Sequence, residues 1–199
     1  DVDLVGVWPY WLDGAAPTTV RNSLALRGMV LLTGPNMAGK STLLRSTCAA
    51  ALLGACGLAA PLAPGSALPY LDAFMLRNFS ADAPAEGRSS FAVEMHEMRA
   101  VLEDATPASL VLVDELGKGT EVRAGAALAG AMLEALDGAA ARGVFATHLH
   151  LMLGLGLELA RTERMAMEVE WSGGEGGGPR RGRPTWRVVP GECTDSLAL

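Results

Sequence analysis

Cysteine and basic side chains are scarce in this sequence of 199 residues. Its three cysteines, Cys48, Cys56 and Cys193, are an odd number without a C-x-x-C spacing. This pattern argues against a disulfide framework and a zinc site, and it fits a reducing compartment. Sixteen basic residues against twenty-two acidic ones give a net charge of −6, so the surface as a whole repels a phosphate polymer. If nucleic acid is involved, we expect another part of the protein to grip it.

Long apolar runs and a targeting signal are missing too. Glycine, proline or charge interrupts every stretch of about 18 residues that would otherwise suggest a membrane span. The opening Asp-Val-Asp lacks the basic-then-apolar order of a signal peptide. We therefore predict a soluble, intracellular protein. Half of the residues are hydrophobic and 19% are charged, which excludes disorder as the whole description and predicts one domain over residues 1–199.

Apolar runs alternate with helical spacings along most of the chain. Short apolar runs predict buried parallel strands over residues 28–33, 110–113 and 143–147, and a further strand is expected over 71–76. Helices are predicted from periodic positions, which are Leu44, Cys48, Ala51 and Ala55; Phe91, Met95, Met98 and Leu102; and Leu128, Met132 and Ala135. The first of these helices follows Ser41 and ends near Gly57. We expect an α/β fold with a mostly parallel sheet covered on both faces.

The two ends of the chain have a different character. Residues 1–27 mix aromatic residues with proline and glycine in short pieces, which predicts a small antiparallel subsheet ahead of a core over residues 28–157. Low-complexity residues 172–184 are interpreted as the loop of a hairpin between strands 165–171 and 185–189.

The strongest motif lies between the first buried strand and the first helix. Residues 34–41, Gly-Pro-Asn-Met-Ala-Gly-Lys-Ser, fit G-x-x-x-x-G-K-[ST], and Lys40 is one of only two lysines. Glycines let the backbone N–H groups face a phosphate, Lys40 reaches the β- and γ-phosphates, and Ser41 ligates Mg²⁺. The alternative is a glycine turn that only begins a buried helix. The motif predicts a P-loop that binds ATP with Mg²⁺.

Two later strands end in residues that suit phosphate chemistry. Asp114 and Glu115 close the strand over 110–113, and His148 follows the strand over 143–147. Ligands of such sheets bind at the carboxyl ends of the strands. Asp114 would hold Mg²⁺, Glu115 would act as general base on the attacking water, and His148 would donate a hydrogen bond near the γ-phosphate. The alternatives are a pair of carboxylates that caps a surface strand and a structural histidine.

Together these motifs resemble the ATPase domain of the DNA mismatch-repair MutS family. The resemblance rests on four segments in the family's order, which are residues 33–42, 87–95, 110–120 and 146–148. Further segments, residues 9–13, 48–57, 147–150 and 191–198, look most like the plant and algal organelle branch. That branch implies a mitochondrion or chloroplast; the rest of the family implies the bacterial cytoplasm or the nucleus.

The resemblance implies an ABC-type P-loop ATPase that works as a head-to-head dimer. Ser89 would reach the γ-phosphate held by the partner subunit, residues 117–120 would lie along the dimer seam, and Val20 and Asn22 would lie near the adenine. The implied loop residues that bind nucleotide are Gly34, Pro35, Asn36, Met37, Ala38, Gly39, Lys40, Ser41 and Thr42. Mismatched DNA would be bound by domains upstream of residue 1, and the dimerisation helices would follow residue 199.

The function predicted is Mg²⁺-dependent hydrolysis of ATP to ADP and phosphate that drives a DNA mismatch-recognition clamp. Residues 121–125 depart from the common family wording, which leaves open a nucleotide switch that dimerises with little catalysis. A MutS relative that restrains recombination is a further alternative. An ABC transporter domain would need a Leu-Ser-Gly-Gly-Gln signature, and Arg88 to Phe91 stand in its place.

Overall fold

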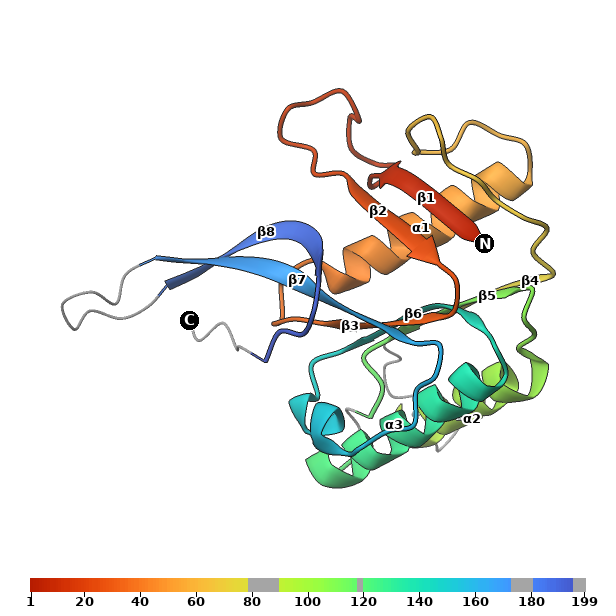
Figure 1. Ribbon diagram of the computed structural model, residues 1–199, viewed down its shortest axis with the longest axis vertical. Coiled ribbons are helices and arrows are strands. Elements are labelled where there is room, and N and C mark those ends of the chain that lie inside the picture. Colours follow the sequence, from red (N-terminus) through yellow and green to blue (C-terminus); the bar gives the residue numbers. More distant parts are fainter. Residues whose placement is uncertain (79–89, 118–119, 173–180, 195–199) are drawn as a thin grey trace.

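The fold is built on one mixed sheet of six strands (Figure 1). A computed structural model describes residues 1–78, 90–117, 120–172 and 181–194. The strands are β3 (Met29–Thr33), β4 (Ala73–Arg77), β5 (Ser109–Asp114), β6 (Arg142–Thr147), β7 (Glu163–Ser172) and β8 (Arg181–Pro190). Their order is β4-β5-β6-β3-β7-β8, and every neighbouring pair is parallel except β7 with β8. The predicted α/β fold with a mostly parallel sheet is confirmed.

Helices cover both faces of this sheet, as Figure 1 shows. The helix α1 (Lys40–Ala55) lies on one face, and α2 (Ser90–Asp104), α3 (Val122–Gly138) and the short 3₁₀ helix η2 (His150–Gly154) lie on the other. Strand β3 alternates between the two cores, because Val30 and Leu32 pack on the α1 side whereas Met29 and Leu31 pack on the α3 side. Burial on both faces explains why the central strands are continuous apolar runs.

The N-terminal residues form the small antiparallel sheet that the sequence predicts. It pairs β1 (Val2–Val7) with β2 (Asn22–Leu26) and lies over α1 (Figure 1). The pairing of β7 with β8 is also confirmed, and the hairpin extends well beyond the helical layers (Figure 1). Both strands are longer than predicted, because Ser172 and residues 181–184 of the predicted loop pair with each other and with neighbouring residues of β7. The N-terminal strand of the hairpin joins the edge of β3, with Val30 opposite Glu163 and Thr33 opposite Ala166.

Two details of the helices differ from the sequence prediction. The buried face of α3 carries Ala126, Ala129, Leu133 and Leu136, whereas Ala135 of the predicted face is exposed. Alanines lie on the buried and the exposed sides of α3 alike, so the apolar spacing alone does not identify the buried side. In α1, Leu44 and Ala51 are buried as expected, but Ala55 is exposed in the last turn. The expected polar loop over residues 80–87 lies outside the described residues.

The parallel register places the functional strand ends side by side. Thr33 pairs with Thr147, and Asp114 pairs with Ala146, so the carboxyl ends of β3, β5 and β6 meet at one edge of the sheet. None of the helices in the described ranges combines the length and the apolar character that a membrane crossing needs.

Substitution of Gly143 in β6 tests how closely β6 packs against β5. A Cβ at Gly143 would overlap the backbone carbonyl oxygen of Val111 in the neighbouring strand. We expect Gly143→Ala to lower the free energy of unfolding by about 3 kcal/mol, since overpacking against a backbone group forces the strand to shift. Urea unfolding followed by circular dichroism measures this. The matched control is Gly138→Ala at the end of α3, where a Cβ meets open space; equal losses in both variants would contradict the prediction.

Candidate functional site

The loop between β3 and α1 is shaped by two glycines with positive φ. Gly34 has φ +152° and Gly39 has φ +100°. A Cβ at Gly34 would lie 2.9 Å from Cβ of Met167, and one at Gly39 would lie 3.2 Å from Cδ1 of Trp186. The loop is therefore pressed against the β7–β8 hairpin. Since α1 begins at Lys40, its first backbone N–H groups have no acceptor within the helix and face this loop.

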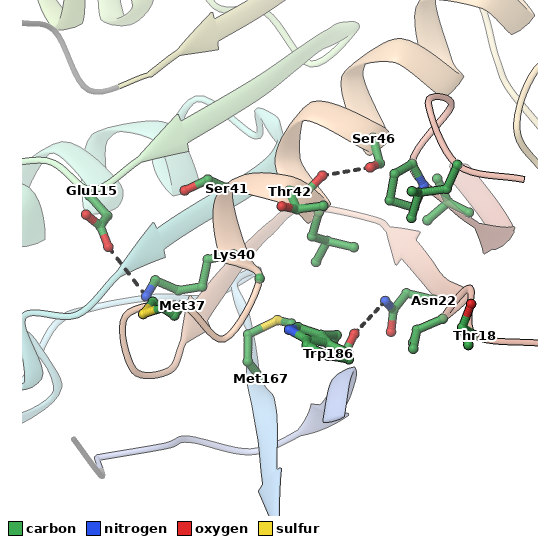
Figure 2. Close-up of a pocket in the computed structure, with 16 residues that line it drawn as sticks. Thr18, Asn22, Met37, Lys40, Ser41, Thr42, Ser46, Glu115, Met167 and Trp186 are labelled. Carbon is green, nitrogen blue, oxygen red and sulfur yellow. Dashed lines mark hydrogen bonds and ion pairs between the residues drawn. The ribbon is translucent and has the colours of Figure 1, made fainter. Parts of the chain in front are cut away.

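Lys40 is held inside the loop by three oxygen atoms. Its side chain is 3% exposed, and its Nζ donates to the carbonyl oxygens of Gly34 (2.8 Å) and Pro35 (3.1 Å). The same nitrogen lies 3.4 Å from Oε1 of Glu115, as the dashed line in Figure 2 shows. The only charged partner among these three oxygens is the carboxylate from the end of β5.

Glu115, directly after β5, lies beside two other residues that the sequence singles out: Lys40 at the start of α1 and His148 directly after β6. Its φ is +51°, and its N–H donates to the carbonyl oxygen of Ala146 on β6 (3.0 Å). Its Oε1 lies 3.4 Å from Nζ of Lys40 and 3.6 Å from Nδ1 of His148. Lys40, Glu115 and His148 are thus brought together around one carboxylate oxygen.

Asp114 offers a buried oxygen that suits a cation. It is the last residue of β5, it is 4% exposed, and its Oδ1 has no hydrogen-bond partner among the described residues. A buried acceptor of this kind needs a compensating partner. Mg²⁺ prefers oxygen ligands and usually binds through one or two carboxylates and substrate phosphates. The buried carboxylate of Asp114 and the hydroxyl of Ser41 therefore fit that ion.

A cavity of about 430 Å³ opens beside the loop. Figure 2 shows its lining side chains. The predicted site residues that line it are Val20, Asn22, Met37, Gly39, Lys40, Ser41, Thr42 and Glu115. Of the other predicted residues, Gly34, Pro35, Asn36 and Ala38 belong to the loop without lining the cavity, and Asp114 and His148 stand at the strand ends beside it. Ser89 lies outside the described residues.

Sequence reasoning missed half of the residues that line this cavity. The missed lining residues are Val7, Pro9, Leu12, Thr18, Leu43, Ser46, Met167 and Trp186. Trp186 comes from β8, is half exposed and has φ +58°. Its aromatic side chain lies beside Met167 at the rim (Figure 2). A lone tryptophan after a low-complexity stretch carries no signal of this position, because only the pairing of β8 with β7 brings it to the loop.

Asn22 binds the hairpin rather than pointing free into the cavity. Its Nδ2 donates to the carbonyl oxygen of Trp186 (3.0 Å), and its Oδ1 accepts from the N–H of Val188 (2.8 Å) (Figure 2 shows the first bond). These bonds join β2 to β8 on both sides of Arg187. The amide thus holds the left-handed backbone of Trp186 in place.

Comparison of the sequence with known proteins identifies the family. The family model described as MutS domain V matches residues 30–177. The chain belongs to the MutS family. It is 44% identical, over 98% of its length, to a protein of Arabidopsis thaliana named "DNA mismatch repair protein MSH1, mitochondrial", of which it covers 17%. The predicted resemblance to the MutS family is therefore confirmed.

Bacterial MutS proteins are similar over a shorter range. Identity to the DNA mismatch repair protein MutS of Granulibacter bethesdensis is 45% over 75% of the chain, and to that of Thermus aquaticus it is 44% over 73%. The match to the mitochondrial relative extends across nearly the whole chain, as the resemblance to the organelle branch implies. The chain spans less than a fifth of the length of these three relatives.

The tie made by Asn22 in this MutS domain can be tested by amide exchange. We expect Asn22→Ala to accelerate hydrogen exchange at Val188 about tenfold, because a hydrogen bond contributes about 1 to 1.5 kcal/mol net. Exchange followed by NMR measures it. The control is Ser23→Ala on the same strand, whose hydroxyl accepts from Gly6 instead. Unchanged exchange at Val188 in Asn22→Ala would show that the hairpin does not depend on this amide.

Proposed function

We propose that this domain binds ATP with Mg²⁺ and hydrolyses it to ADP and phosphate. The observation that supports this most strongly is the meeting of Lys40, Glu115 and His148 around one carboxylate oxygen, next to the buried Asp114. These groups follow β3, β5 and β6, whose carboxyl ends meet at one edge of the sheet, beside the cavity. This edge is where ligands of such sheets bind.

The loop and the hairpin would bind different ends of the nucleotide. The N–H groups at the start of α1 and the Nζ of Lys40 suit the phosphates, because a helix N-terminus attracts anions. The apolar part of the cavity, with Val20, Met167 and Trp186, suits the adenine, which stacks on aromatic rings. In this proposal Asn22 contributes indirectly, because it holds Trp186 at the rim.

Hydrolysis would use the carboxylates at the end of β5. Glu115 would accept a hydrogen bond from the attacking water and orient it, with Lys40 transferred from the loop carbonyls to the phosphate oxygens. The water oxygen would bond to the γ-phosphorus while the bond from the γ-phosphorus to ADP breaks. His148, next to Glu115, would donate a hydrogen bond to the γ-phosphate. Asp114 and Ser41 would hold Mg²⁺, which when bound offsets the negative charge of the phosphates. No covalent enzyme intermediate is needed.

The biological role we propose follows from the relatives' names. The domain would supply the ATP-driven step of a protein that recognises mismatched double-stranded DNA, with the DNA bound by domains outside this chain. The net charge of −6 agrees with this division of labour. Two such domains would act head to head, with Ser89 of one reaching the nucleotide of the other. The organelle relative supports a mitochondrion or chloroplast as the compartment.

The role of Glu115 predicts a separation of binding from turnover. We expect Glu115→Gln to slow phosphate release by about 10² to 10⁴, the usual contribution of a general base, while ATP still binds. Calorimetry with ATP and Mg²⁺ measures binding, and phosphate release is followed over a range of protein concentrations because the proposal needs two chains. A near-parent rate of release in the variant would refute this role. Tight ATP binding by the parent chain without phosphate release would favour the nucleotide switch.

The role of Lys40 predicts a loss of binding. We expect Lys40→Met to weaken ATP binding about ten- to hundredfold, since hydrogen bonds to charged groups contribute about 1.5 to 3 kcal/mol. The matched control is Arg45→Met, which removes a positive charge from an exposed position on the same helix. Both affinities are measured by calorimetry. Equal affinities in the two variants would show that the phosphates lie elsewhere.

A further inference from the structure

A buried arginine outside the motifs is bonded to the backbone carbonyls of Asp114, the proposed Mg²⁺ ligand, and Glu115, the proposed general base. Arg77 ends β4, the strand beside β5, and its side chain is 2% exposed. Its Nη1 donates to the carbonyl oxygen of Asp114 (3.0 Å) and lies 3.4 Å from that of Glu115. The register explains the reach, because Arg77 pairs with Val113, directly before these residues.

Glu94 on α2 completes the network from the opposite side. Its Oε1 accepts from Nη2 of Arg77 (2.7 Å), and its Oε2 accepts from the N–H of Gly117 (3.0 Å). Glu94 is 3% exposed, so this ion pair is buried. Arg77 and Glu94 together therefore bind the backbone at both ends of the turn over residues 114–117.

That turn contains two residues with positive φ. Glu115 has φ +51°, a conformation that is uncommon for residues other than glycine, and Gly117 has φ +86°. Strained backbone persists where the surroundings hold it. The N–H of Glu115 is fixed by Ala146 of β6, and its carbonyl side faces Arg77. A buried ion pair by itself is weak support for stability, because its desolvation cost offsets much of its attraction.

We propose that Arg77 and Glu94 are positioning residues for hydrolysis at this site. By holding the 114–117 turn they aim the carboxylates of Asp114 and Glu115 at the bound nucleotide and link them to α2. That helix begins at Ser90. The preceding residue, Ser89, is the one proposed to contact the nucleotide of the partner subunit. This inference rests on the function proposed above, and neither residue belongs to the loop or lines the cavity.

Arg77→Lys and Glu94→Gln test the proposal with small changes of shape. A lysine ammonium cannot reach Glu94 and the Asp114 carbonyl in the fork geometry of arginine, and glutamine keeps the outline of Glu94 while removing its charge. We expect each variant to lower kcat by about 10²-fold, since a small misplacement of catalytic groups has an effect of this size. The affinity for ATP should change less than threefold, because Lys40 and the loop are untouched. Amide exchange at Gly117 should accelerate.

The control is Arg99→Lys, which changes an exposed arginine on α2 that pairs with Glu103 within the same helix. It should retain the parent kcat and exchange. The melting temperature is measured for all variants, and Glu115→Gln and the parent chain are assayed beside them. If the parent hydrolyses ATP and Glu115→Gln does not, yet folded Arg77→Lys and Glu94→Gln keep the parent kcat and the parent exchange at Gly117, the positioning role is wrong and the proposed function stands. If Glu115→Gln turns over like the parent, the role of Glu115 and the positioning role both fail while ATP hydrolysis stands. If the parent releases no phosphate, the proposed function and the positioning role both fail.

Discussion

The contact between Lys40 and Glu115 depends on the parallel register of β3, β6 and β5, because that register brings the ends of β3 and β5 to one edge of the sheet. Lys40 follows β3 through the glycine loop, and Glu115 follows β5, two strands away in the sheet. A shift of one residue in the pairing of β3 with β6 or of β5 with β6 would point each side chain of the shifted strand to the other face of the sheet. The packing of the apolar strands thus also determines where the charged residues at the strand ends are placed.

The sequence was sufficient to predict the central half of the molecule. Continuous apolar runs predicted β3, β5 and β6 within a residue or two, and the polar residues placed directly after them predicted which side chains would meet. This succeeds because a strand buried on both faces has a local signature and because parallel strand ends share an edge. The face of α3 was harder to predict, since alanine and glycine on both sides of that helix leave packing to decide which side is buried.

The parts that escaped prediction depend on pairings between distant segments. Trp186 reaches the cavity only because β8 pairs with β7 and Asn22 bonds to β8 across 164 residues of sequence. Arg77 and Glu94 read as one basic residue at a strand end and one acidic residue on a helix, and both residue types are usually solvated. Their burial follows from the placement of β4 beside β5 and of α2 beneath them, which no local pattern encodes.

These long-range contacts divide the site into two mechanically different halves. The half around the glycine loop is built on β3, β5 and β6, at the centre of the sheet, where neighbouring strands on both sides fix each backbone. The other half is built on β8, an edge strand, and on the small sheet of β1 and β2. The side chain of Asn22 joins β2 to β8. Edge elements open at lower cost than central strands. A nucleotide that spans both halves, as proposed above, would therefore stabilise the hairpin more than the core.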